Sequence, residues 1–242
     1  MDNLCKKLID RLLELGADKA VVSYNESEDS EYNLIYKELN LLRSLESKRL
    51  NLAAYKDNKR AIKSINQIDE ASVEEALTEL IQSVQEGNPD PAFDIAEYQE
   101  PAAFTDGPLK PDNDQIVKRL QEFSQEMKSQ YPCVHFDASM SHTHSKTRLI
   151  NSNGLDVTME RGYYEFSTVF TAKKDGKMSS MNYTYFQTAN LDKPCLDYNQ
   201  GRELIRQIVE QTHPGSIPQK FVGDVILAPM VMGGLVYTLI QS

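Results

Sequence analysis

The sequence has few of the residues that most often build disulfide, metal or nucleic-acid sites. It contains three cysteines and four histidines in 242 residues, and Lys plus Arg number 26 against 36 for Asp plus Glu. Cys5, Cys133 and Cys195 form an odd set without CxxC spacing, which favours structural thiols in a reducing cytoplasm over a disulfide framework. The formal net charge of -10 argues against binding DNA, RNA or an anionic membrane, because neutralising phosphates requires clustered Lys and Arg.

Signatures of several enzyme and targeting classes are also missing. The sequence has no P-loop, no dinucleotide-binding fingerprint and no grouped Ser, His and Asp pattern of a catalytic triad. The N-terminus lacks the apolar core of a signal peptide. The longest uncharged run, residues 225–242, is interrupted by Pro229 and by Gly233-Gly234. We therefore expect a buried strand followed by a core-facing helix there, rather than a membrane anchor.

The first part of the chain predicts a helix followed by about four strands. The N-terminal helix ends at Gly16 and places four leucines on one face: Leu4, Leu8, Leu12 and Leu15. Alternating residues predict strands over 19–25 and 31–45, and two more strands on either side of the turn at 56–58. We expect these elements to pack onto or extend the sheet that the later hairpins form.

A second helix then closes this first unit. Ser72, three residues before Glu75, has the spacing of a capping box, and Gly87 ends the apolar stripe that follows. Residues 87–111 carry five of the ten prolines and little periodicity, which is typical of a connector. We expect residues 1–90 to form a first α+β repeat and residues 91–111 a Pro-rich connector.

The rest of the chain repeats this order of elements. A helix is predicted over 112–130 with four apolar residues facing inward: Ile116, Leu120, Phe123 and Met127. A strand over 133–139, a meander over 146–187 and a helix over 198–211 follow. The segments at 47–64 and 164–181 each place a Lys-Asp turn between two strands, an echo that indicates internal duplication. We expect residues 112–215 to form the second repeat and residues 216–242, with a strand over 221–227, to begin a further domain.

The meander at 146–187 is the clearest part of the pattern. Its runs are rich in β-branched and aromatic residues, and the turns Ser152-Asn153-Gly154 and Lys174-Asp175-Gly176 suit antiparallel hairpins. The predicted fold class is therefore α+β, with antiparallel β-meanders and flanking helices arranged twice as helix, about four strands, helix.

Several short segments, taken in their order and spacing, resemble one known family. They are LGAD after the first helix, AYKDNKRAIKSIN, EASVEEALTELI, NPDP, INSNGLDV and FTAKKDGKMSSM. This order resembles the PmbA/TldD proteins, also named "putative modulators of DNA gyrase", in which one kind of subunit is a metalloprotease. The resemblance covers the whole chain but only the N-terminal half of a full-length member. We therefore expect the native protein to continue beyond Ser242 with a β-rich second half.

The resemblance also implies which kind of subunit this chain is. Protease members carry His-Glu-x-x-x-His on a helix after a strand, where the histidines bind zinc and the glutamate activates bound water. In the matching register Tyr237, Thr238 and Ser242 occupy the first His, the Glu and the second His positions. The four histidines are followed by Phe136, Thr143, Ser145 and Pro214. We expect a PmbA (TldE)-like subunit with no catalytic or metal-binding residues of its own.

The function that this implies is that of a non-catalytic subunit in a cytoplasmic peptidase complex. The complex would act on unfolded or extended peptides, including peptide antibiotic precursors and antitoxins, and a TldD-like partner would supply the zinc. The alternative is a homo-oligomeric peptide-binding or scaffold protein without a protease partner. A third and weaker hypothesis is modulation of gyrase through protein contacts, since the acidic charge disfavours DNA.

Three groups of residues leave a functional and a structural interpretation open. His142 and His144 would share one face of a strand and could hold zinc or copper, but His135 and Cys133 have the opposite parity, which favours polar residues near a strand end. Asn151, Asn153 and Gly154 could bind a peptide backbone, although forming the turn is the favoured role. Five aromatic residues suit either core packing or an apolar groove: Tyr163, Tyr164, Tyr183, Tyr185 and Phe186.

Overall fold

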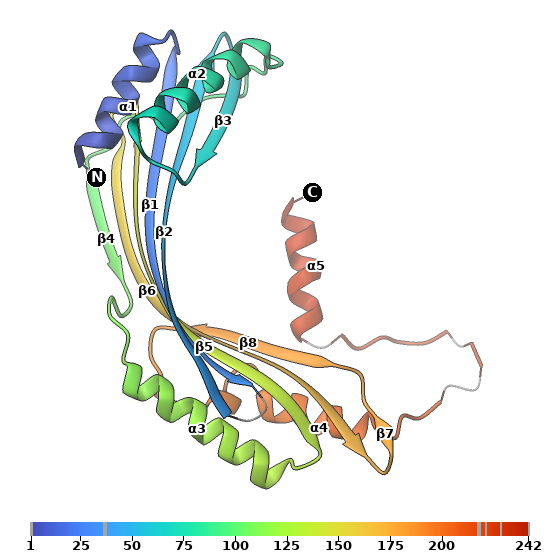
Figure 1. The fold of residues 1–242 in the computed structure, drawn as a ribbon. Coiled ribbons are helices and arrows are strands. Elements are labelled where there is room, and N and C mark those ends of the chain that lie inside the picture. The colour runs from blue at the N-terminus through green and yellow to red at the C-terminus, as the bar shows by residue number, and fades with distance from the viewer. Residues whose placement is uncertain (1, 36–37, 217–218, 221, 228, 242) are drawn as a thin grey trace. The chain divides into compact units, whose positions relative to one another are not determined.

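The computed structural model describes residues 2–35, 38–216, 219–220, 222–227 and 229–241 (Figure 1). They divide into two compact units, Met1–Thr212 and His213–Ser242. The second unit contains helix α5 (Pro229–Gln241). The first unit contains four α-helices: α1 (Asp2–Glu14), α2 (Glu70–Glu86), α3 (Asn113–Gln130) and α4 (Gly201–Glu210). A short 3-10 helix, η1 (Cys195–Asp197), precedes α4.

Eight strands of the first unit form one sheet. They are β1 (Lys19–Ile35), β2 (Glu38–Lys56), β3 (Lys59–Ile65), β4 (Ala102–Asp106), β5 (Val134–Asn151), β6 (Asp156–Lys174), β7 (Lys177–Met178) and β8 (Asn182–Thr188). The order is β3-β2-β1-β5-β6-β4, and β7 and β8 also pair with β6. Every pairing is antiparallel except that of β4 with β6. The predicted α+β class with antiparallel meanders is confirmed.

Helices cover one face of this sheet at each end of its long strands. Figure 1 shows α1 and α2 at one end, and α3 and α4 at the other. Buried residues on β1 keep one parity along the strand, as Ala20 and Val22 near its start and Tyr32 and Leu34 near its end show. Strand side chains alternate between faces, so this parity marks the helix-covered face throughout.

Two separate hydrophobic cores result from this arrangement. The first packs α1 and α2 on β1, β2 and the end of β5, and includes Leu12, Leu52 and Leu77. The second packs α3, η1 and α4 on β5, β6 and β8, and includes Leu120 and Phe166. The inward-facing residues predicted for the helix at 112–130 are all buried, and so are Leu8 and Leu12 of the first helix.

The same topology is present on both sides of the central β1–β5 pair. Helix α1, strands β1, β2 and β3, and helix α2 are followed by α3, β5, β6, β8 and α4 in the same order. Each half also has a two-residue hairpin turn with positive φ at both positions, Asp57-Asn58 in the first and Asp175-Gly176 in the second. Both predicted repeats thus contribute their strands to one sheet.

The long strands correct two predicted boundaries. The predicted strand over 31–45 was wrong, because β1 continues to Ile35 and β2 begins at Glu38. The predicted strand over 133–139 is the first part of β5, which runs to Asn151. The middles of these strands are polar, and they pair through contacts such as Asn25 Nδ2 to Thr147 Oγ1 at 2.7 Å. Cross-strand hydrogen bonds therefore sustain strand where hydrophobic alternation is absent.

Three local predictions also need correction. Asp69, not Ser72, caps α2, because its carboxylate accepts the backbone N–H of Ser72 at 3.0 Å. The connector contains strand β4, which the sequence pattern of residues 87–111 did not predict. The strand predicted over 221–227 is irregular across the described residues 222–227, and Phe221 lies outside them.

Candidate functional site

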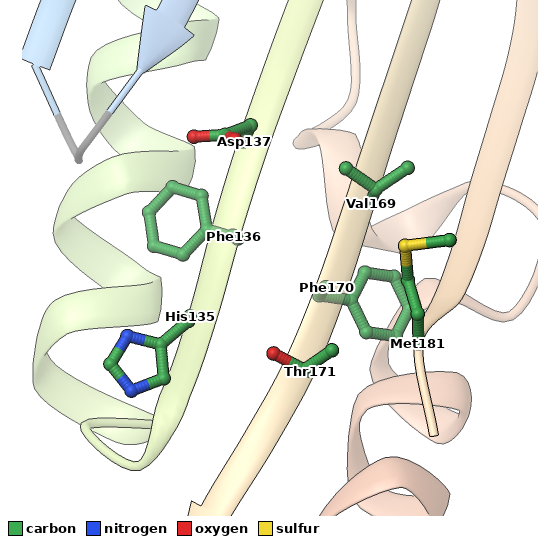
Figure 2. A pocket seen from close by; sticks show the side chains of 7 residues that line it. All are labelled: His135, Phe136, Asp137, Val169, Phe170, Thr171 and Met181. Carbon is green, nitrogen blue, oxygen red and sulfur yellow. The ribbon is translucent and has the colours of Figure 1, made fainter. Parts of the chain in front are cut away.

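The second half of the sheet carries a hollow of about 500 Å³ (Figure 2). Its lining comes from β5, β6 and the segment before β8: His135, Phe136, Asp137, Val169, Phe170, Thr171 and Met181. This volume is within the usual range of small-molecule and side-chain pockets. Of these seven residues the sequence analysis considered His135 alone, as a possible metal ligand with unfavourable parity, because the hollow depends on strand register.

Strand register places four of these side chains together. His135 lies opposite Thr171, and Asp137 lies opposite Val169, in the antiparallel β5–β6 pair. These positions have the parity opposite to the buried residues, so they line the sheet face that points away from α3 and α4. Phe136 and Phe170, which are buried, belong to the helix-covered face. On the exposed face the hollow therefore combines the apolar side chains of Val169 and Met181 with one imidazole, one carboxylate and one hydroxyl group.

Exposed apolar side chains continue from the hollow. We call five of them the apolar band: Val169, Met178, Met181, Tyr183 and Tyr185. Tyr183 lies opposite Val169 in the β6–β8 pair, so the band crosses from β6 to the neighbouring strand. Aromatic residues and methionines are enriched where proteins bind peptides or other proteins. An extended peptide could place an apolar side chain in the hollow and lie against this band.

The five aromatic residues considered in the sequence are divided between two roles. Tyr164 and Phe186 are buried in the second core, where Phe186 stacks on Tyr198 with ring centroids 4.0 Å apart. Tyr183 and Tyr185 are exposed on the other face. Tyr163 is partly buried beneath the Arg161 guanidinium, 5.4 Å from the ring centroid. Residues that alternate along the same strands therefore divide between core packing and the exposed apolar surface.

His142 and His144 do share one face of β5, as predicted, but they have different surroundings. His142 is 1% exposed and its Nε2 lies 2.7 Å from the carbonyl oxygen of Pro108. His144 lies 3.0 Å from Glu160 and is partly exposed. The prediction of polar residues near a strand end was wrong for His142, because the loop after β4 covers it. Among the described residues, no group of three or more His, Cys, Asp or Glu side chains is placed to hold a metal ion.

A close backbone contact accompanies His142. A Cβ atom on Gly162 would lie 1.7 Å from the carbonyl oxygen of Pro108, and one on Gly107 would lie 2.0 Å from the carbonyl oxygen of Gly162. Only glycine allows these backbones to approach so closely. The hydroxyl of Tyr164 accepts the backbone N–H of Asp112 at 3.0 Å. These contacts attach the segment between β4 and α3 to the middle of β6.

Asn151, Asn153 and Gly154 lie together in the turn between β5 and β6. The side-chain oxygen of Asn151 accepts the N–H groups of Asn153 and Leu155, each at 3.0 Å, and its amide donates to the Ala96 carbonyl at 2.7 Å. Gly154 has φ of 96° and packs against Tyr98. These contacts show that the residues form the turn and hold the connector. Peptide binding by Asn153 and Gly154, which are less buried, stays a prediction.

Two buried arginines bind other segments of the second half. Arg119 of α3 donates from Nε to the Leu191 carbonyl and from Nη2 to the Asp192 carbonyl, both at 2.7 Å. Arg148 of β5 forms a two-pronged ion pair with Asp156, at 2.9 and 2.7 Å. The hydrogen bond from Arg148 holds the pKa of Asp156 below its usual value.

Burial raises the pKa of the Cys195 thiol to about 12, which keeps the thiol protonated and favours a structural role.

The residues that replace the protease motif lie in the second unit. Tyr237 and Thr238 are exposed on α5, where Thr238 Oγ1 donates to the Gly234 carbonyl at 2.9 Å. Ser242 lies outside the described residues. No described helix, α5 included, is long and apolar enough to cross a membrane.

Comparison with known proteins defines the class to which this architecture belongs. Residues 106–212 match the model of the PmbA/TldA metallopeptidase central domain. This segment contains α3, α4, all seven residues that line the hollow, and the Pro108–His142 contact. Over this segment the resemblance to the PmbA/TldD proteins that was drawn from the sequence is confirmed. No curated protein matches the sequence.

Solved structures share the fold at low sequence identity. TldE from Thermococcus kodakarensis aligns with a TM-score of 0.63 and 15% identity, over 86% of this chain and 46% of its own. A putative modulator of DNA gyrase from Bacteroides thetaiotaomicron aligns with a TM-score of 0.67 and 16% identity, over 86% and 49%. A third, from Thermotoga maritima, has a TM-score of 0.56, 15% identity, and covers 86% and 47%. The chain thus spans less than half the length of each of these proteins.

Proposed function

We propose that this chain is the non-catalytic subunit of a cytoplasmic PmbA/TldD-type metallopeptidase complex that processes unfolded or extended peptides. The observation that carries the proposal is the match of residues 106–212 to the central domain of a metallopeptidase family. The sequence adds that no histidine is followed by glutamate, and that Tyr237, Thr238 and Ser242 stand in the motif positions. A TldD-like partner with His-Glu-x-x-x-His would bind the zinc.

The hollow and the apolar band supply a role for this subunit. Peptide substrates of varied sequence share an extended backbone and exposed apolar side chains, which an open, largely apolar surface accommodates. His135 and Asp137 add polar groups at the rim that would orient the peptide. Peptide antibiotic precursors and antitoxins are substrates of this kind. A role in modulating gyrase would act through protein contacts.

The test is reconstitution with a TldD-like partner. We expect the isolated chain to contain no stoichiometric zinc and to leave an unfolded peptide intact, with or without added metal. The mixed complex should contain zinc and cleave the peptide, and a chelator should abolish cleavage. Tyr237→Ala or Thr238→Ala in this chain should leave the zinc content of the complex unchanged. Elemental analysis and peptide digestion measure these outcomes.

A variant of the hollow separates peptide binding from assembly. Val169→Glu places a charge among apolar groups and should weaken cleavage by the complex, whereas Ile62→Glu on β3 should not. Both residues are exposed, so neither change should unfold the chain. Tight zinc and chelator-sensitive cleavage by the isolated chain would overturn the proposal, and His135, His142 and His144 would then be the first ligands to replace.

The second candidate function is a homo-oligomeric peptide-binding or scaffold protein. The apolar band favours it equally, because the band needs no catalytic partner to bind a peptide. Copurification from native cells distinguishes the two functions. A stoichiometric metalloprotease supports the first, and self-association without a protease supports the second.

A further inference from the structure

The hairpin that joins β6 to β7 concentrates positive charge at the end of the sheet (Figure 1). Its residues 173–177 read Lys-Lys-Asp-Gly-Lys, which places three cations beside one carboxylate in a chain of formal charge -10. Lys174 lies directly opposite Lys177 in the β6–β7 pair. Like charges at opposed positions destabilise a hairpin, so these lysines need another explanation than the stability of the turn.

The corresponding turn of the first half shows a structural use for such lysines. Lys56 and Lys59 lie opposite each other across that turn. Lys59 donates to the Gln85 carbonyl in the last turn of α2 at 2.7 Å, and a Cβ atom on Gly16, after the end of α1, would lie 3.2 Å from Lys56 Nζ. Positive charge is favourable at a helix C-terminus. The first pair of lysines therefore stabilises the ends of two helices.

The lysines of the β6–β7 hairpin have no such use. Lys173, Lys174 and Lys177 are all exposed. In the part of the chain that the structure describes, none of the three forms an ion pair or a side-chain hydrogen bond. Their ammonium groups are therefore available to a ligand.

Strand register places the hairpin at one end of the hollow. His135 lies opposite Thr171, and Lys173 is two residues further along β6 on the same face of the sheet. Two residues of strand span about 6.5 Å, a distance that a lysine side chain can reach across. Asp137 and Val169 line the other end, as Figure 2 shows. The hollow thus has an imidazole and a lysine at its hairpin end and a carboxylate at the opposite end.

The apolar band leads to the same end of the hollow. Tyr185, Tyr183 and Met181 come successively nearer to the hairpin along β8 and the segment before it, and Met178 lies opposite Lys173. An extended chain that lies along the band therefore reaches the lysines last, because the sheet ends at this hairpin. A peptide that ends there places its terminal carboxylate among the ammonium groups.

We propose that the hollow and the β6–β7 hairpin together bind the C-terminus of an extended peptide, with its last apolar side chain in the hollow and its free carboxylate at the lysines. Hydrogen bonds from ammonium groups to a carboxylate are charge-assisted and stronger than neutral ones. His135 can donate to the same carboxylate. This inference rests on the proposed function, because it assigns one end of the peptide to the surface described there.

Charge selects this ligand and sets its direction. The formal charge of -10 repels carboxylates from most of the protein surface, and the hairpin is a local exception. Asp137 at the far end of the hollow disfavours a peptide bound in the reverse direction. An acidic side chain inside a longer peptide would not fit equally well, because the peptide would have to continue past the end of the sheet.

A matched set of peptides tests the proposal on the full chain. The probe is a fluorescently labelled peptide of Gly and Ser that ends in Leu, prepared as the free acid and as the C-terminal amide. Fluorescence anisotropy should show that the acid binds at least about tenfold more tightly than the amide, and that added salt reduces the difference. Equal affinities, or no binding of either peptide, would overturn the proposal.

A third peptide separates a terminal carboxylate from an acidic side chain. It has Glu before the final Leu and an amidated C-terminus. We expect it to bind as weakly as the plain amide. Binding as tight as that of the free acid would show that a side-chain carboxylate serves equally, which would overturn the assignment of the C-terminus.

Variants of the two corresponding turns provide a control for charge. Lys173→Met and Lys177→Met should each raise the dissociation constant of the free acid about threefold or more and leave that of the amide unchanged. Lys59→Met removes the same charge from the other turn and should not affect peptide binding. Thermal melts should show the reverse order, because Lys59 contacts α2 and Lys177 contacts no helix. Equal weakening by Lys59→Met and Lys177→Met would indicate unspecific attraction and contradict the site.

The cleavage assay distinguishes failure of this inference from failure of the proposed function. A reconstituted complex that cleaves peptides, together with an isolated chain that binds acid and amide equally, would remove the inference alone. Selective binding of the acid by a chain that forms no active complex would support the inference and remove the proposed role in proteolysis.

Discussion

The two halves of the first unit share a topology but differ in their interiors. Tyrosines aside, every buried polar or charged side chain in the described residues lies in the second half: Arg119, Ser124, His142, Arg148, Asn151, Thr168, Thr184 and Thr212. The side chains that the first half contributes to the core around α1 and α2 are apolar or tyrosine, whereas Arg148 and Asn151 of the second half flank Ile150 of that core. The two halves of the sequence therefore differ in the kinds of side chain that they bury.

The difference follows from the segments that each half must hold. Three buried polar side chains of the second half bond to backbone carbonyls of irregular segments: Asn151 to Ala96, His142 to Pro108 and Arg119 to Leu191. A carbonyl that is buried without a partner is costly, so such segments need internal donors. In the first half, β2 and β3 are joined by a two-residue turn, which needs no such donor. Polar burial here marks where the connector and the loop after β8 pack against the rest of the fold.

The largest expected effect tests whether the two cores contribute equally. Leu77 in the first core and Leu120 in the second are both fully buried. Leu77→Ala and Leu120→Ala should each lower the free energy of unfolding by about 2–5 kcal/mol, through lost burial and a cavity. Urea unfolding measures the loss, and the exposed Leu45→Ala is the control at under about 0.5 kcal/mol. A much smaller loss at one position would show that the two cores are not equivalent.

The close backbone contact between Gly162 and Pro108 should have no counterpart in the first half. Counted back from the hairpin turns, Gly162 of β6 corresponds to Ser44 of β2. Gly162→Ala should cost about 1–3 kcal/mol, because its Cβ would overlap the Pro108 carbonyl and the backbone must shift. Ser44→Ala should change stability by less than about 0.5 kcal/mol. Equal thermal melts for both variants would contradict the contact.

Two glycine turns should respond differently to substitution. Gly154→Val should destabilise the protein by about 1 kcal/mol or more, because φ is positive and Tyr98 lies 2.9 Å from the added Cβ. Gly176→Asn should cost less than about 0.5 kcal/mol, since the corresponding turn of the first half has Asn58 at this position with φ of 60°. Chemical denaturation of both variants provides the measurement. If Gly176→Asn cost as much stability as Gly154→Val, the Asp175-Gly176 turn would not be equivalent to the Asp57-Asn58 turn of the first half.

The smallest expected effect concerns acid stability. A hydrogen bond from Arg148 lowers the pKa of Asp156, and one from Asn33, assisted by Arg43, lowers that of Glu31. A lowered folded-state pKa stabilises the protein above the unfolded value of about 4, and this stabilisation is lost as pH falls through the folded value. Arg148→Met should therefore reduce the loss of stability between neutral and acidic pH.

The same comparison applies to the first half. Arg43→Met should change the acid dependence less, because the Arg43 side chain is largely exposed and Arg148 is buried. Urea unfolding at neutral and acidic pH measures both variants. A larger effect from Arg43→Met would reverse the expected order of the two halves.

Local sequence determined the elements and the turns. The leucine spacing of α1, the apolar stripe of α3 and the Asn-Gly and Asp-Gly turns each act within a few residues, so their patterns are visible in order along the chain. The repeated order of elements and the family resemblance were also visible, because both depend on segments read in sequence. The cap of α2 was misplaced by three residues, since Asp69 and Ser72 are both good caps.

Only the tertiary structure decided where strands end and which groups meet. The polar middles of β1 and β5 show no alternation, and cross-strand partners alone sustain them. The hollow, the Pro108–His142 contact and the parallel strand β4 each join residues distant in sequence, through register that no local pattern encodes. Burial of His142 follows from a loop that reaches it from 34 residues away. The sequence therefore determined the units of this fold, and long-range packing decided its site.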